Sequence, residues 1–152
     1  CAASATPGDK RIAEMNRSIA QIEQKDRELR TLRIKRTVMK PDLFKGADLV
    51  AIKSAAGDFL KKDKSDADVL RTTVISGDWK EERVLEHTDT TRTAVRYRIT
   101  REVTAQIAGK TGADVFLYTI HVAKDQRADG TWSPLYGHVM YSDPMLEENV
   151  NK

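Results

Sequence analysis

The stretch RTAVRYRITREVTAQI (residues 92–107) alternates apolar and polar side chains with a two-residue period. One face would carry the apolar side chains of Val95, Tyr97, Ile99, Val103, Ala105 and Ile107. Side chains of a β-strand point alternately to its two faces, so this pattern predicts a strand with one buried and one solvent-exposed face. At about 3.4 Å per residue the stretch would exceed about 50 Å, and we expect so long a strand to twist, bend or bulge.

The rest of the chain after residue 68 is also strand-like. Four further runs with β propensity are separated by short turns rich in Gly, Asp and Ser. They cover residues 69–76, 79–87, 114–124 and 131–141. Short connections join neighbouring antiparallel strands, so the sequence predicts a meander.

Two helical patterns precede the strands. From Asp9, the expected N-cap, Ile12, Met15, Ile19, Ile22 and Leu29 recur at spacings of three and four residues, with Asp26 interrupting the series. We expect a short strand or an extended connection to follow around residues 31–39, and a second helix over residues 42–62. The second apolar face consists of Leu49, Ile52, Ala56, Phe59 and Leu60. Gly57 and the small pair Ala55 and Ala56 are expected to let that helix approach its neighbour closely.

These patterns predict an α+β fold with three parts. Residues 1–8 form a flexible tether, residues 9–36 an amphipathic basic helix or stem, and residues 37–152 a single domain. In that domain one helix packs on a bent antiparallel meander of four to five strands. The narrow apolar stripe of residues 9–36 fits either a helix serving its own chain or a coiled-coil homo-oligomer.

Residues 31–141, with a helix followed by a bent meander, resemble the cystatin-like and NTF2-like folds. The resemblance implies a ligand pocket between helix and sheet, into which Tyr97 and Arg101 of the long strand would point. Arg101 falls within the apolar face, and a buried charge needs a partner. A bulge that turns Arg101 to solvent, or a neutralising carboxylate nearby, would explain it equally well.

Charge is distributed unevenly along the chain. Residues 1–40 hold ten Lys and Arg against five Asp and Glu, whereas the remainder holds 16 basic and 18 acidic residues. A nucleic-acid-binding domain carries its basic patch on the folded part, so we expect no nucleic-acid partner. A basic stem suits an anionic membrane surface or simple solvation.

Cys1 is the single cysteine, and small residues follow it in CAASATPGDK (residues 1–10). This stretch resembles the mature end of a bacterial lipoprotein, in which the cysteine sulfur carries the lipid. The resemblance implies a protein of the cell envelope, anchored to the outer membrane through Cys1 and facing the periplasm or the surface. Several acyl chains give stable anchoring where one is marginal.

The sequence offers few residues for catalysis or metal binding. His87, His121 and His138 are far apart in the chain, and none has the short spacing of a metal site. We expect no catalytic centre, no metal and no cofactor. If the last two strands pair through a turn at 126–130, His121 would lie beside Leu135 and away from His138.

The final run, DGTWSPLYGHVMYSD (residues 129–143), gathers aromatic side chains along one strand. Pro134 lacks an amide donor, which favours an edge strand, and an exposed edge can dock a partner by strand addition. We therefore identify Trp132, Pro134, Tyr136 and His138 as a candidate partner-binding edge. The function we expect is non-catalytic binding or assembly at the envelope, with an NTF2-like enzyme or ligand carrier and a coiled-coil oligomer as alternatives.

Overall fold

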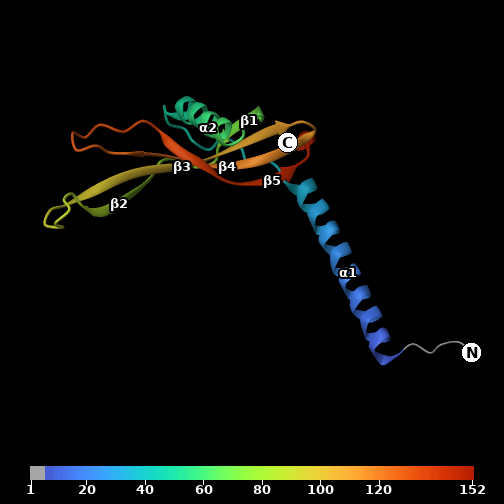
Figure 1. The fold of residues 1–152 in the computed structure, drawn as a ribbon. Coiled ribbons are helices and arrows are strands. Elements are labelled where there is room, and N and C mark those ends of the chain that lie inside the picture. The colour runs from blue at the N-terminus through green and yellow to red at the C-terminus, as the bar shows by residue number, and fades with distance from the viewer. Residues whose placement is uncertain (1–5) are drawn as a thin grey trace, which may run out of the picture. The chain divides into compact units, whose positions relative to one another are not determined.

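The computed structural model describes residues 6–152 and divides the chain into two compact units, Cys1–Arg36 and Thr37–Lys152. The proposed lipidation site, Cys1, lies outside the described residues. The α+β architecture predicted from the sequence is confirmed, with helices α1 and α2 and a five-stranded antiparallel sheet (Figure 1).

Helix α1 spans Pro7–Arg36 and has no buried residue. Its N-cap is Thr6 and not Asp9, because the backbone amide of Asp9 donates to Oγ1 of Thr6 at 3.4 Å and the Asp9 carboxylate accepts from the Thr6 hydroxyl at 2.7 Å. Pro7 then occupies the first helical position, where its missing N–H costs nothing. The helix continues through Arg36, so the expected strand or extended connection begins only at Thr37.

The sheet is built around the long strand β3, Val95–Thr111. Strand β4 (Asp114–Asp125) pairs with β3, and β5 (Tyr136–Met145) pairs with β4 as the outermost strand. The turn between β3 and β4 is shorter than expected. Thr111 and Asp114 are paired partners, and Gly112, with a φ of 61°, occupies the tight turn between them.

Strands β1 (Asp68–Val74) and β2 (Lys80–His87) differ from the expected meander, because each pairs with β3 and neither pairs with the other. β1 lies against Ala105–Lys110 and β2 against Val95–Glu102. The long β3 has room for both, and the connection between them stays on the sheet edge. Within it, Ile75 donates its amide to the Thr104 carbonyl at 3.0 Å.

The bend expected of β3 is accommodated in its neighbours. The register of β1 against β3 shifts between Val69 and Arg71, and that of β5 against β4 shifts at Met140. Each shift inserts one extra residue into an outer strand, which increases the local twist and bends the sheet.

Helix α2 spans Leu49–Asp63 and covers one face of the sheet (Figure 1). It starts at Leu49 and therefore later than predicted. Asp42, the expected start, instead accepts the Val74 amide at 2.7 Å and the Lys53 ammonium at 2.6 Å, which fastens the preceding loop to β1. Gly57 meets nothing within 4 Å of a Cβ position, so the predicted close approach does not occur there.

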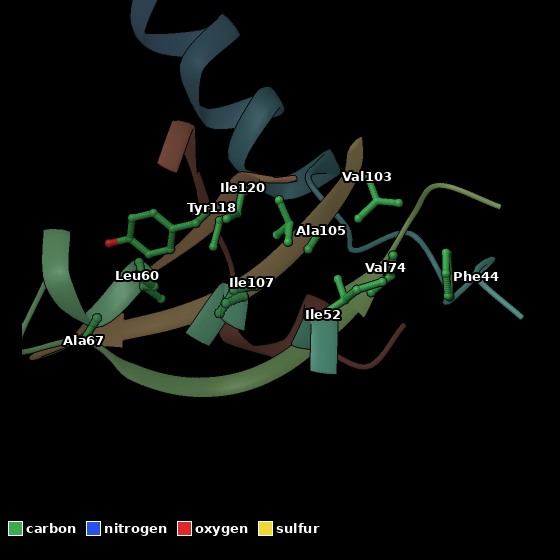
Figure 2. Packing of buried hydrophobic residues seen from close by; sticks show 12 residues of the cluster. Phe44, Ile52, Leu60, Ala67, Val74, Val103, Ala105, Ile107, Tyr118 and Ile120 are labelled. Carbon is green, nitrogen blue, oxygen red and sulfur yellow. The ribbon is translucent and has the colours of Figure 1, made fainter. Parts of the chain in front are cut away.

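The core between α2 and the sheet is filled by side chains from both. Ile52, Ala56 and Leu60 of α2 are fully buried, and Figure 2 shows Leu60 beside the ring of Tyr118. Facing them are the buried side chains Val74, Val103, Ala105, Ile107, Tyr118, Ile120 and Val122. The face of the sheet opposite α2 carries a smaller cluster that includes Met39, Leu117 and Val150.

Candidate functional site

The candidate site lies where the outer edge of β5 runs alongside α2. An open depression of about 390 Å³ is lined on the helix side by Phe59, Lys62 and Asp63, and on the strand side by residues 135–139. A second depression, of about 520 Å³, is lined by Ala55, Asp58, Phe59, Lys61, Lys62 and Leu135. The two share Phe59, Lys62 and Leu135, so they form one groove, which we call the α2/β5 groove.

Gly137 positions the strand side of this groove. A Cβ at this residue would lie 1.8 Å from the His121 carbonyl oxygen and 3.0 Å from Cε2 of Phe59. Only a residue without a side chain therefore allows β5 to lie so close to β4 and to the ring of Phe59. The apolar floor of the α2/β5 groove depends on that close approach.

Tyr136 stands at the end of the groove and is tied to β4. Its hydroxyl donates to Oδ1 of Asp125 at 2.8 Å, and Thr100 donates to the same oxygen at 2.7 Å. Burial, followed by the bond to the Asp125 carboxylate, raises the pKa of Tyr136 above its usual value. The Tyr136 ring is consequently held in place although 43% of the residue is exposed.

Trp132 and Arg101 belong to a stack of aromatic rings and cations. The Arg101 guanidinium lies 4.6 Å from the centroid of the Trp132 ring and 3.1 Å from the Glu81 carboxylate. The Lys124 ammonium lies 5.2 Å from the centroid of the Trp132 ring and 4.4 Å from that of Trp79. Cations over indole faces are attracted by the ring quadrupole, so this stack fastens the β4–β5 connection to the sheet.

Asp48 completes the stack from the start of α2. The Trp79 indole N–H donates to its Oδ2 at 3.0 Å, and the Lys124 ammonium lies 3.3 Å from the same oxygen. The indole bond, with help from Lys124, holds the pKa of Asp48 below its usual value. The charges of Arg101 and Lys124 are thus matched by Glu81 and Asp48, which gives both cations a structural role.

Tyr97 lies away from Arg101, on the part of β3 that pairs only with β2. The tyrosine is 69% exposed, and the depression beside it is lined by Arg96, Tyr97, residues 126–128 and Gly130. Arg101 is the fourth residue after Tyr97, which corresponds to about 13 Å along a strand. The structure therefore does not bring the two side chains of the predicted ligand pocket together.

The histidines correct a sequence-based expectation. His121 pairs directly with His138 across β4 and β5, and their ring centroids are 5.4 Å apart. The turn lies slightly later in the chain than expected, because the Arg127 amide donates to the Thr131 carbonyl at 2.7 Å. The residues between Ser133 and β5 then shift the pairing of β5 with β4 further, so that His138 and not Leu135 lies opposite His121. His138 is exposed on the face of the sheet opposite α2.

Glu102 joins this pair from β3. Its Oε2 lies 3.0 Å from Nε2 of His121, and the Lys80 ammonium is 3.4 Å from its Oε1. The His121 bond, with a smaller contribution from Lys80, keeps the pKa of Glu102 below its usual value. Nδ1 of His121 is buried without a hydrogen-bond partner.

The described part of the chain shows neither a metal cluster nor a membrane-spanning helix. Within residues 6–152, no group of three or more His, Cys, Asp or Glu side chains is arranged to hold a metal ion. Over the same residues, no helix is long and apolar enough to cross a membrane.

Comparison with known proteins gives no further guide to the site: no family model, no curated protein and no solved structure matches this chain.

Of the predicted edge residues, Tyr136 and His138 lie in β5, the outermost strand, and are among the residues that line the groove. Trp132 and Pro134 precede β5, which begins at Tyr136 and so later than predicted. Phe59 and Lys62 were missed as site residues, because Phe59 fits the core stripe of α2 and Lys62 an ordinary helix end. Two adjacent depressions that share these residues are visible only once α2 is placed against β5.

Proposed function

We propose that this chain is a non-catalytic binding protein of the bacterial cell envelope that takes an extended segment of a partner protein at the β5 edge. The observation that carries the proposal is the α2/β5 groove, which runs beside the free edge of β5. An unpaired strand edge offers backbone donors and acceptors to an added strand, and an adjacent groove selects its side chains.

The groove chemistry defines the class of segment that fits. Phe59, Leu135 and Val139 offer an apolar surface, and the helix side carries two cations, Lys61 and Lys62, together with two anions, Asp58 and Asp63. The matching ligand is an extended stretch with apolar side chains on one face and an acidic group that pairs with Lys62. Exposed Met140 and Tyr141 extend the contact surface along β5.

A library of displayed twelve-residue peptides, selected on the full chain, tests this proposal. Selected peptides should slow amide hydrogen exchange in Tyr136–Met145. Lys62→Glu should weaken their binding several-fold, because it reverses a charge on the groove. Lys64→Glu, just beyond α2, is the matched control and should leave binding unchanged. Peptides that protect other strands and leave β5 unprotected would contradict the proposal.

The envelope location is a separate part of the proposal and rests on sequence. It is supported by the lone Cys1 in a run of small residues and by the basic excess in residues 1–40. The gene segment that encodes the residues before Cys1 should contain a lipoprotein processing site, and mass spectrometry of the native protein should find Cys1 acylated. An unmodified Cys1 would remove the membrane anchor from the proposal and leave the β5 edge unaffected.

The alternative of an enzyme or ligand carrier gains no support from the packing. A pocket between α2 and the sheet would have to occupy the space that is filled by Ile52, Leu60 and Tyr118. Gly109 shows how tight this space is, since a Cβ there would lie 2.8 Å from the Tyr118 ring.

A further inference from the structure

The apolar stripe of α1 is exposed along its whole length. Ile12, Met15, Ile19, Ile22 and Leu29 are between 50% and 67% exposed. Large apolar side chains aligned on one face of a helix mark an interaction surface when they are not buried. This surface is distinct from the α2/β5 groove and is not needed for the proposed function.

The stripe has the spacing of a coiled coil. In heptad notation Ile12, Ile19, Asp26 and Arg33 take the a positions, and Met15, Ile22, Leu29 and Arg36 take the d positions. Asp26 is paired with Arg30 one turn later, at 2.8 Å between the charged groups. The apolar part of the stripe therefore fits a partner helix, and the charged positions restrict how that partner can lie.

We propose that the partner of α1 is α1 of a second copy of this chain, bound antiparallel. In the register we propose, Ile12 lies opposite the partner's Leu29, and Ile19 lies opposite the partner's Ile22. The residue numbers of two facing core positions therefore add up to 41. In this register each apolar residue of the stripe except Met15 faces another apolar residue. The two copies of the α1 helix then overlap over nearly their full length.

Charge complementarity selects the antiparallel orientation. In this register Asp9 flanks the partner's Arg30, and Ser18 flanks the partner's Lys25, so the flanking positions bring no like charges together. Asp26 faces the partner's Met15. The flanking Asp9–Arg30 pair occurs twice in the dimer, once at each end.

A parallel, in-register pair brings like charges together instead. Asp26 would face the partner's Asp26 and Arg33 the partner's Arg33 at core positions. Lys25 would flank the partner's Arg30. Like charges at such positions are repulsive, so the parallel pair is disfavoured and the antiparallel pair is the one that the sequence of α1 allows.

Disulfide trapping of the full chain tests both pairing and orientation. In a Cys1→Ser background, chains with Ile12→Cys and chains with Leu29→Cys, of different mass, are mixed and mildly oxidised. The antiparallel pair places the thiol introduced at position 12 beside the thiol introduced at position 29 of the other copy. Two copies of the Ile12→Cys chain would instead hold their introduced thiols about 25 Å apart. Mixed disulfides should therefore exceed self-linked dimers at least about tenfold.

The matched control uses Arg17→Cys and Gln24→Cys, whose numbers also add up to 41 but which lie on the outer face of α1. This pair should form no excess of mixed disulfide. Adding Ile19→Asp to the Ile12→Cys and Leu29→Cys chains should abolish their cross-link. Mainly self-linked Ile12→Cys dimers would show a parallel pair, and cross-links no more frequent than in the outer-face control would show no pair at all. Either result overturns the proposal.

Discussion

Gly137 and Gly57 differ in what surrounds them, and the difference predicts opposite effects of the same substitution. Gly137→Ala would place a Cβ 1.8 Å from the His121 carbonyl oxygen, so β5 must move away from β4. We expect a loss of more than about 2 kcal/mol in the free energy of unfolding. Urea denaturation of the variant measures it, and an unfolding midpoint equal to that of the natural chain would contradict the packing described for β5.

Gly57→Ala provides the matched control in α2. Nothing lies within 4 Å of its Cβ position, and alanine is the better helix former. We expect this variant to be more stable than the natural chain by up to about 1 kcal/mol. If Gly57→Ala destabilised the protein, the outward position of this residue on α2 would be wrong.

Glu102 links stability to pH through His121. Its carboxylate has a lower pKa in the folded chain than its ordinary value of 4.5, so the folded state favours the charged form. The stabilisation is therefore present above about pH 4.5 and is lost as the pH falls through the lower folded pKa. The difference in unfolding free energy between the natural chain and Glu102→Gln should accordingly be largest near neutral pH and shrink in acid.

Urea denaturation at a series of pH values from neutral to acid measures this difference. Glu82→Gln, on the exposed part of β2, serves as the control and should show little change across the series. A Glu102→Gln difference that stayed constant from neutral to acid pH would show that the His121 bond does not stabilise the fold.

At the scale of elements, the stack around Lys124 fastens the long β4–β5 connection. Trp132→Ala removes the ring that lies over both Arg101 and Lys124. We expect a loss of about 1–2 kcal/mol and faster tryptic cleavage at Arg127, because the connection loses its ring contacts with Arg101 and Lys124. Limited proteolysis followed by mass spectrometry identifies the cleavage site. Unchanged cleavage at Arg127 would mean that Trp132 does not hold the connection.

The elements also show how far the sequence determines this fold. The alternation in residues 92–107 specified β3 as a strand and the inward direction of Val103, Ala105 and Ile107, which are buried. It was wrong about the rest of the buried face, because Val95 and Tyr97 are 54% and 69% exposed where β3 extends beyond β4. Gln106, on the face predicted to be exposed, is buried. The pairing of β1 with β3 could not be read from local pattern, because short connections normally join neighbouring strands. The pairing register of β4 with β5 could not be predicted either. It depends on how the residues between the two strands are arranged, and a small error in placing the turn changes the partner of His121 from His138 to Leu135.

The candidate site was predictable only in part, for a related physical cause. Pro134 predicted an edge strand from backbone chemistry alone, and β5 is the outermost strand, but Pro134 itself lies before β5 in the β4–β5 connection. The helix side of the groove depends on how α2 is placed across the sheet, and that placement follows from the buried contacts of Ile52, Ala56 and Leu60. Phe59 lies beside this buried row and so reaches the groove.

At the scale of the whole molecule, residues 37–152 contain everything that a folded core requires. Both clusters of buried apolar side chains are drawn from Met39–Val150, and α1 contributes no buried residue. We therefore expect the fragment 37–152 to fold alone, with an unfolding free energy within about 0.5 kcal/mol of that of the full chain. Chemical denaturation of the two proteins side by side measures the difference.

The C-terminal end gives the contrasting truncation. Val150 is buried, its carbonyl accepts the Arg71 guanidinium at 2.8 Å, and Asn149 donates to the Thr37 carbonyl at 3.1 Å. Removing only residues 146–152 uncovers Met39 and leaves these polar groups without their partners, so we expect a loss of at least about 2 kcal/mol. Removing the seven C-terminal residues should therefore lower the free energy of unfolding more than removing the thirty-six N-terminal residues. If the N-terminal truncation were the more damaging, the core would have to include α1.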